Sequence, residues 1–370
     1  MELTVKASDL QREVQLVYGV IERKATIPIL SNILLKAIKG EIQLTATDIE
    51  VTIKSSCPAT VSSEGAVTLL GQKIYESIRF LPPDAEINMK LKENNWMIIH
   101  CERTKYRIAG IASDEFPIIQ ECDYSQAVTL QWAPVKHMIN KVIFAITAED
   151  TRYALRGALM ELDENGITFV ATDGHRLAYI HKNEKTGLKS GKIYRSIIPR
   201  KALHELLKVD DENQILFYSE SENHLFFKVG NREIIANAVE GEFPDYMKIL
   251  ADREDRKIRI VTQEFMDALK RVSPFSSEKM KGVTLSMEEG KMEILASSAD
   301  QGEAEETIQA EYSGKQMKIN FNARYLAEFL TAVGSEQIVM NLKDESSHGM
   351  FKPENGEEFQ YKYVVMPMST

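Results

Sequence analysis

KGEIQLTATD, residues 39–48, is a turn followed by a short run in which apolar and polar residues alternate. Similar stretches contain Gly166 and Gly290, so that they and Gly40 are spaced by 126 and 124 residues. Alternation of this kind after a turn predicts a hairpin strand with one buried face. The chain is therefore expected to build the same hairpin three times.

Other landmarks repeat with nearly the same period. They are Leu10, Met138 and Met266 in helical segments, Asp48, Asp173 and Asp300 after the turns, and Glu115-Phe116-Pro117 with its copy Glu242-Phe243-Pro244. A solenoid repeat has about 20–50 residues, whereas a small domain has about 100–150. We therefore expect three copies of one domain, at residues 1–123, 127–250 and 255–370.

Each unit combines two helical segments with several short strands. The apolar spacing predicts helices at residues 9–17 and 72–81, at 134–146 and 200–207, and at 263–272 and 323–333. The remaining runs alternate with a period of two, as strands do. The fold class expected from these patterns is α+β, with two helices packed on antiparallel sheets in each repeat.

Composition excludes several classes of protein. The 370 residues are 44% hydrophobic and carry a net charge of −10, which argues against a chain coated in nucleic acid. No apolar run reaches the roughly 18 residues that span a bilayer, and the N-terminus does not resemble a signal peptide. The three cysteines form no CxxC pair, which favours a reducing, cytoplasmic environment.

No catalytic motif stands out. The chain has no phosphate-binding GxxxxGK[ST], no GxGxxG, no HExxH and no GxSxG. Asp173 and His175 lie two residues apart, so a hydrolase or metal enzyme using this pair is one alternative. Alternate residues of a strand share a face without any such purpose, and a scaffold without a nucleic-acid role is a second alternative.

Cations gather on the predicted helices and their flanks, whereas many acids lie in hairpins and loops. If the helices of all units face one side, that side is relatively basic. Such cations bind phosphates without reading bases. From the residues alone, the chain is interpreted as a three-domain α+β repeat protein that functions in an assembly.

Three further runs carry a family signature. They are Ala171-Thr-Asp-Gly-His-Arg-Leu-Ala178, Glu242-Phe-Pro-Asp-Tyr246 and Tyr363-Val-Val-Met-Pro-Met368. With Thr26-Ile-Pro-Ile-Leu-Ser-Asn32 and the threefold repeat, the whole chain resembles the bacterial DNA polymerase III beta subunit, the sliding clamp family. The resemblance implies a head-to-tail homodimeric ring of six domains that encircles double-stranded DNA. It also implies that the protein is not an enzyme and needs no cofactor or metal.

The resemblance assigns three sets of residues. The partner-peptide site would comprise Arg152, Leu155, Thr172, Gly174, His175, Arg176, Leu177, Pro244, Lys248, Ile249, Val364, Met366, Pro367 and Met368. DNA would be contacted by Arg23, Lys24, Arg200 and Lys201. The dimer interface would comprise Lys73, Arg103 and Lys105 of one chain, facing Phe275, Asp300, Glu303, Glu305 and Glu306 of the other.

The implied partners are the alpha subunit of DNA polymerase III, the clamp loader complex, and other polymerases and repair proteins. They would bind through short linear peptides, and no membrane is involved. The chain departs from the family at Ser369-Thr370, where Arg-Leu is frequent, and at Lys248, where arginine is common. We therefore expect the peptide preference to differ from that of other members.

Overall fold

The computed structural model describes residues 1–370 except 22–26, 148, 150–151, 211–212, 252–255, 278–280, 299–301, 357 and 369–370. Of the predicted residues, Arg23, Lys24, Asp300, Ser369 and Thr370 lie outside the described part, as does residue 255, the expected start of the third domain. The chain forms two compact units, residues 1–136 with 201–238 and residues 137–200 with 239–370. The second sequence repeat therefore contributes strands to both units.

The first unit is built on one antiparallel sheet of 12 strands, in the order β1-β6-β7-β8-β5-β2-β3-β4-β16-β15-β14-β9. The strands are β1 Glu2–Lys6, β2 Asn32–Ile38, β3 Glu41–Thr47, β4 Val51–Ser63, β5 Gly65–Leu70, β6 Glu86–Leu91, β7 Trp96–Cys101, β8 Thr104–Ile111, β9 Val128–Gln131, β14 Ile215–Ser221, β15 His224–Val229 and β16 Arg232–Asn237. Because β4 pairs with β16, this sheet runs without a break from the first repeat into the second.

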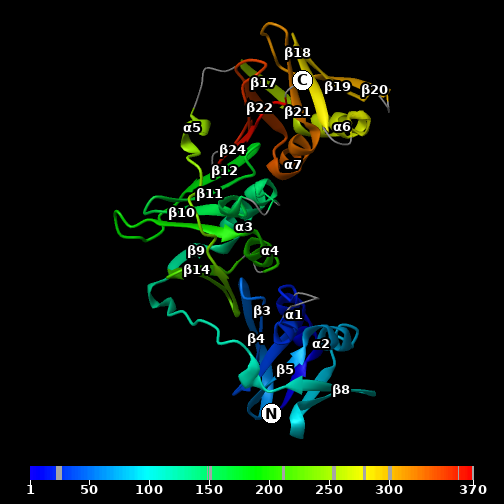
Figure 1. Ribbon diagram of the computed structural model, residues 1–370, viewed down its shortest axis with the longest axis vertical. Coiled ribbons are helices and arrows are strands. Elements are labelled where there is room, and N and C mark those ends of the chain that lie inside the picture. The colour runs from blue at the N-terminus through cyan, green and yellow to red at the C-terminus, as the bar shows by residue number, and fades with distance from the viewer. Residues whose placement is uncertain are drawn as a thin grey trace. The chain divides into compact units, whose positions relative to one another are not determined.

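Helices α1 (Ala7–Tyr18) and α2 (Gly71–Ile78) pack on each other and on the strands of the first repeat (Figure 1). The buried face of α1 includes Leu10, Val14 and Val17 at helical spacing, as the sequence predicts. Glu13 lies on the same face and is fully buried, which the apolar pattern does not predict. Its carboxylate receives hydrogen bonds from Arg232 on β16.

The second unit contains two sheets among the described residues. An antiparallel sheet of eight strands has the order β13-β10-β11-β12-β24-β23-β22-β17, and a sheet of four has the order β20-β19-β18-β21. The strands are β10 Gly157–Leu162, β11 Gly166–Thr172, β12 Arg176–Asn183, β13 Tyr194–Pro199, β17 Arg256–Val261, β18 Gly282–Glu288, β19 Lys291–Ser298, β20 Gly302–Gln309, β21 Met317–Asn322, β22 Gln337–Leu342, β23 Gly349–Pro353 and β24 Gln360–Val365. Here β12 pairs with β24, so a second sheet joins two repeats.

The remaining helices are α3 Trp132–Val142, α4 Arg200–Leu207, α5 Met247–Leu250, α6 Thr262–Val272 and α7 Ala323–Val333. Of these helices, α4, α6 and α7 agree well with the expected segments, α3 ends before the predicted residue 146, and the short α5 was not predicted. Helices α6 and α7 pack together beside the four-stranded sheet (Figure 1). In the described part of the chain, no helix is long and apolar enough to cross a membrane.

Candidate binding surfaces

A tight turn between β11 and β12 organises the predicted peptide site. Thr172 Oγ1 donates to the Arg176 carbonyl at 2.6 Å and accepts from Gly174 N at 3.1 Å. Asp173 Oδ1 accepts from the amides of His175 and Arg176 at 2.9 and 3.1 Å. Gly174 has φ +88°, and a Cβ there would overlap the Arg152 guanidinium. Both the left-handed φ and the nearby guanidinium favour glycine at this position.

Arg176 is buried, and its side chain is hydrogen-bonded within the protein. Its guanidinium binds Asp173 and Glu328, donates to the Phe144 carbonyl at 2.6 Å, and lies 4.3 Å from the ring centroid of Tyr325. Burial disfavours its charge, yet interactions with Tyr363 and Glu328 raise the pKa of Arg176 above the ordinary value. The side chain is predicted to bind peptide, but its contacts are those of a buried structural cation.

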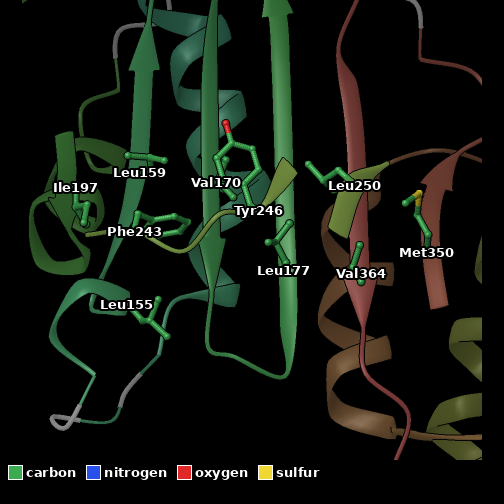
Figure 2. Packing of buried hydrophobic residues seen from close by; sticks show 10 residues of the cluster. All are labelled: Leu155, Leu159, Val170, Leu177, Ile197, Phe243, Tyr246, Leu250, Met350 and Val364. Atoms are coloured by element: carbon green, nitrogen blue, oxygen red, sulfur yellow. The ribbon is translucent and has the colours of Figure 1, made fainter. Parts of the chain in front are cut away.

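An apolar cluster lies behind the turn (Figure 2). Its buried members are Leu155, Leu159, Val170, Leu177, Ile197, Phe243, Tyr246, Leu250, Met350 and Val364, with Ile249 packed against them. Leu177 on β12 and Val364 on β24 face each other in register, and the chain at Phe243–Tyr246 crosses β10 and β11 (Figure 2). The cluster thus brings together four predicted residues: Leu155, Leu177, Ile249 and Val364.

The C-terminal segment lies against this cluster. Met366 N donates to the His175 carbonyl at 2.8 Å, and Met368 N donates to the Asn320 carbonyl at 2.8 Å. The side chain of Met366 is 52% exposed, whereas Pro367 and Met368 are partly buried. A flexible thioether at the surface is an adaptable contact for apolar ligands.

The other predicted peptide residues lie at the surface around the cluster. Arg152 is exposed and donates from Nη1 to the Asp173 carbonyl at 2.8 Å. His175 and Pro244 are exposed, and Lys248 pairs with Asp245 at 2.9 Å. Sequence reasoning missed the buried Phe243, Tyr246 and Met350, although the repeated Glu-Phe-Pro run pointed to the first of them.

The predicted DNA contacts that the structure describes lie at the start of α4. Lys201 Nζ donates to the Val20 carbonyl at 3.1 Å and forms an ion pair with Asp48. Arg200 occupies the first position of α4 and is partly buried. The charge of Lys201 is therefore already balanced by an acid within its own unit.

The predicted interface residues of the first unit lie around β8. Lys73 is on α2, Arg103 is in the turn between β7 and β8, and Lys105 is on β8. Strand β8 pairs along its length with β7, but with β5 only at Gly110 and Ile111. A cavity of about 430 Å³ opens beside it, lined by Leu70, Lys73, Ser77, Trp96, Tyr106, Arg107, Ile108 and Ala109.

The acidic partners lie on β20, which is an edge strand of its sheet. Glu303 and Glu305 are exposed, whereas Glu306 accepts from Arg271 Nε at 2.7 Å. Phe275 ends a short 3-10 turn that contacts β20, and its side chain is 37% exposed. An apolar ring and two exposed acids therefore occur together at one sheet edge.

The enzyme alternative receives no support from the site. The Asp173 carboxylate accepts hydrogen bonds from the amides of His175 and Arg176 and from the Arg176 side chain, and the His175 side chain is exposed. Among the described residues, no three His, Cys, Asp or Glu side chains gather as metal ligands. Repeated α+β units with an apolar surface site, a partly paired strand β8 and an edge strand β20 instead define a class of protein that works by assembly.

Comparison with known proteins identifies the family. Models of the N-terminal, central and C-terminal domains of the DNA polymerase III beta subunit match residues 1–120, 129–245 and 247–369. The chain is 32% identical over 370 residues to the beta sliding clamp of Escherichia coli K12, and the match covers all of both chains. The chain belongs to the DNA polymerase III beta subunit family, and it is a DNA sliding clamp of the three-domain clamp fold.

Two solved structures support this assignment over the full length of this chain and at least 99% of theirs. The sliding clamp of Pseudomonas aeruginosa bound to griselimycin is 30% identical, with a TM-score of 0.94. The beta sliding clamp of Caulobacter crescentus is 28% identical, with a TM-score of 0.92. The latter structure has polyethylene glycol bound to a region that is described as its beta-motif tethering region.

Proposed function

We propose that two copies of this chain close head-to-tail into a ring around double-stranded DNA. The observation that carries this proposal is the presence of two incomplete strand edges, β8 in the first unit and β20 in the second. Exposed edges pair readily with other strands unless they are protected. Pairing of β8 with β20 of the next chain satisfies both edges, and repeating this head-to-tail contact closes a ring when the rotation permits.

The side chains around these edges are complementary. Lys73, Arg103 and Lys105 beside β8 carry positive charge, and Glu303 and Glu305 on β20 carry negative charge. Such patches set register and partner choice more than affinity. Phe275 fills the cavity beside β8 of the next chain and supplies the apolar part of the contact.

The ring holds DNA by topology rather than by tight binding. We infer that Arg23, Lys24, Arg200 and Lys201 contact the phosphates without sequence preference. The pairing of Lys201 with Asp48 weakens its attraction for DNA. A weakly attractive, largely hydrated lining suits a ring that has to slide.

Short peptides of the replicative polymerase, the clamp loader, and other polymerases and repair proteins bind at Met366–Met368 and the neighbouring apolar cluster. We call this surface the β12–β24 site, after the strand pair that carries it. The protein has no enzymatic activity of its own in this proposal and works in the cytoplasm, where the bacterial chromosome is replicated. Residues 1–123, 127–250 and 255–370 are its three domains.

Retention on DNA of defined topology tests the proposal. The protein is loaded onto a nicked circular plasmid with the clamp loader and ATP, the complex is isolated, and the plasmid is then cut. Release on cutting, with retention on the uncut circle, is the expected result. Retention on both forms would mean that the protein grips phosphates directly, and the sliding ring would have to be abandoned.

A further inference from the structure

We propose a second peptide-binding site at the pairing of β4 with β16, which we call the β4–β16 site. It would take an extended segment of a partner protein with an aliphatic side chain next to a basic one. The inference rests on the proposed peptide role of the β12–β24 site, because the two sites are built from corresponding residues of the sequence repeat.

The β4–β16 site is a pocket of about 210 Å³ in the first unit. It is lined by Thr47, Ile49, Glu50, Thr52, Pro117, Ile118, Ile119, Gln120, His224, Ile235 and Asn237. Seven of these residues correspond in the repeat to predicted residues of the β12–β24 site. The seven are Thr47, Ile49, Glu50, Thr52, Pro117, Ile235 and Asn237, which match Thr172, Gly174, His175, Leu177, Pro244, Val364 and Met366.

The turn between β3 and β4 forms one wall of the pocket. Thr47 Oγ1 donates to the Val51 carbonyl at 3.2 Å and accepts from Ile49 N at 3.1 Å. Asp48 Oδ1 accepts from Val51 N at 2.7 Å. Ile49 has φ +82°, a conformation that a β-branched residue rarely adopts.

The turn between β11 and β12 has the same pattern: the Thr172 hydroxyl donates to one carbonyl and accepts from one amide, and the Asp173 carboxylate accepts from an amide. The φ of Gly174 is also similar, at +88°. The two turns are therefore equivalent in backbone geometry as well as in sequence. At the β12–β24 site the left-handed position is glycine, whereas at the β4–β16 site it is an isoleucine. The backbone strain at Ile49 is tolerated although its side chain is 59% exposed and gains little from burial.

The strand that closes each site is also equivalent. Asn237 N donates to the Glu50 carbonyl at 3.0 Å just beyond the β4–β16 ladder. Met366 N donates to the His175 carbonyl at 2.8 Å just beyond the β12–β24 ladder. One hydrogen bond thus continues each pair of strands into its site.

The Glu-Phe-Pro run lies next to each site. Phe116 and Phe243 are both buried, and each is followed by a proline at the rim. The residue after Pro117 is Ile118, whose side chain is fully exposed. Ile49 and Ile118 are therefore two exposed isoleucines at one small pocket. Clusters of exposed apolar side chains are typical of binding surfaces.

The differences between the sites define the ligand. Glu50, Thr52 and Asn237 stand where the β12–β24 site has His175, Leu177 and Met366, so these three positions of the β4–β16 site are more polar and include a carboxylate. Glu50 is exposed and has no ion-pair partner among the residues that the structure describes. An unpaired carboxylate beside two isoleucines favours a lysine or arginine adjacent to an aliphatic side chain.

Photo-crosslinking locates a bound peptide directly. The probe is a synthetic peptide Ala-Lys-Ile-Ser-Leu-Ala with a photoreactive benzoylphenylalanine at one end, and cross-linked residues are mapped by mass spectrometry on the full-length protein. We expect cross-links at Ile49 and at residues 117–120. Ile118→Asp should reduce them about tenfold, which is typical of losing an apolar anchor. Ile193→Asp, at an exposed isoleucine outside both sites, should leave them unchanged.

A charge exchange tests the role of Glu50. Glu50→Lys should weaken binding of the lysine peptide and strengthen binding of a matched peptide that has glutamate instead. Cross-links confined to residues 366–368 would overturn the second site and leave the β12–β24 site intact. Absence of cross-links at both sites, or identical behaviour of the two peptides, would likewise overturn the inference, while the β12–β24 site is tested separately with a polymerase peptide.

Discussion

Arg232 donates from Nε and Nη2 to the two carboxylate oxygens of Glu13, each at 3.0 Å. Glu13 is fully buried on α1, and Arg232 begins β16. Ser55 and Arg12 complete the set of donors around the carboxylate. A two-pronged ion pair therefore links the helix of the first repeat to a strand of the second.

Glu13→Gln should destabilise the protein by on the order of 3 kcal/mol, because Arg232 would keep its buried charge without a counter-charge. A lower melting temperature by calorimetry is the expected result. The matched control is Glu2→Gln, which removes the surface pair of Glu2 with Lys90 and should change stability by less than about 1 kcal/mol. Equal effects of the two substitutions would contradict the importance of the buried pair.

The same carboxylate predicts a pH dependence. Burial raises the pKa of Glu13, but the hydrogen bonds from Arg232, Arg12 and Ser55 outweigh burial and lower the pKa below its ordinary 4.5. The contribution to stability is therefore present above pH 4.5 and lost as the pH falls through the folded pKa. Melting curves of the wild type and Glu13→Gln should converge in acid, and a constant difference down to that range would refute the assignment.

Arg176→Lys should lower the melting temperature, with a loss of about 2 kcal/mol. Lysine cannot reach Glu328 and the Phe144 carbonyl at once, nor stack on Tyr325 as guanidinium does. The control is Arg195→Lys, at an exposed arginine paired with Glu161. If Arg176→Lys instead left stability intact and reduced peptide affinity, Arg176 would contact the ligand directly.

Deletion of residues 366–370 should weaken binding of a fluorescent polymerase peptide at least about tenfold, because it removes the exposed thioether of Met366. Fluorescence anisotropy measures the affinity, and sedimentation velocity should find the dimer intact. Deletion of Ser369 and Thr370 alone serves as the matched control. Unchanged affinity in the longer deletion would refute the proposed β12–β24 site.

Phe275→Ala combined with Glu303→Lys and Glu305→Lys should convert dimers into monomers. The triple variant removes the apolar plug and makes the contact with Lys73, Arg103 and Lys105 repulsive, since all the facing charges are then positive. Sedimentation equilibrium gives the mass directly. Glu306→Gln is the control, because Glu306 already binds Arg271 within its own chain. A persistent two-chain mass in the triple variant would move the interface elsewhere.

Local patterns predicted the elements of this fold well. Helices α4 and α7 begin and end where the sequence indicates, and α6 begins only one residue earlier. Helical periodicity is a property of neighbouring residues, so it can be recognised without knowledge of the rest of the chain. The hairpin at Asn165–Gly166 was recognisable for the same reason.

Long-range strand pairing was not predictable in this way. Strand β4 extends from Val51 to Ser63 and pairs with β16, about half the chain away. Neighbouring residues do not indicate which distant strand will pair, because a half-buried strand can form hydrogen bonds with many other strands. The buried Glu13 was missed for a related reason, since its partner Arg232 lies in another repeat.

The candidate site was predicted by motif, and the structure adds what the motif cannot give. The motif groups Arg176 with surface residues, yet its contacts with Glu328 and Tyr325 lie inside the protein. The repeat aligns Asp48 with Asp173, but the equal backbone geometry of the turns at Ile49 and Gly174 became visible only from their hydrogen bonds and φ angles.

The pairing of β4 with β16 has a mechanical consequence for opening of the proposed ring. A bend at this border would stretch several backbone hydrogen bonds and a buried ion pair together, and the pairing of β12 with β24 stiffens the other border in the same way. In the proposed ring, we therefore expect opening to occur at the contact between chains rather than at either border between repeats.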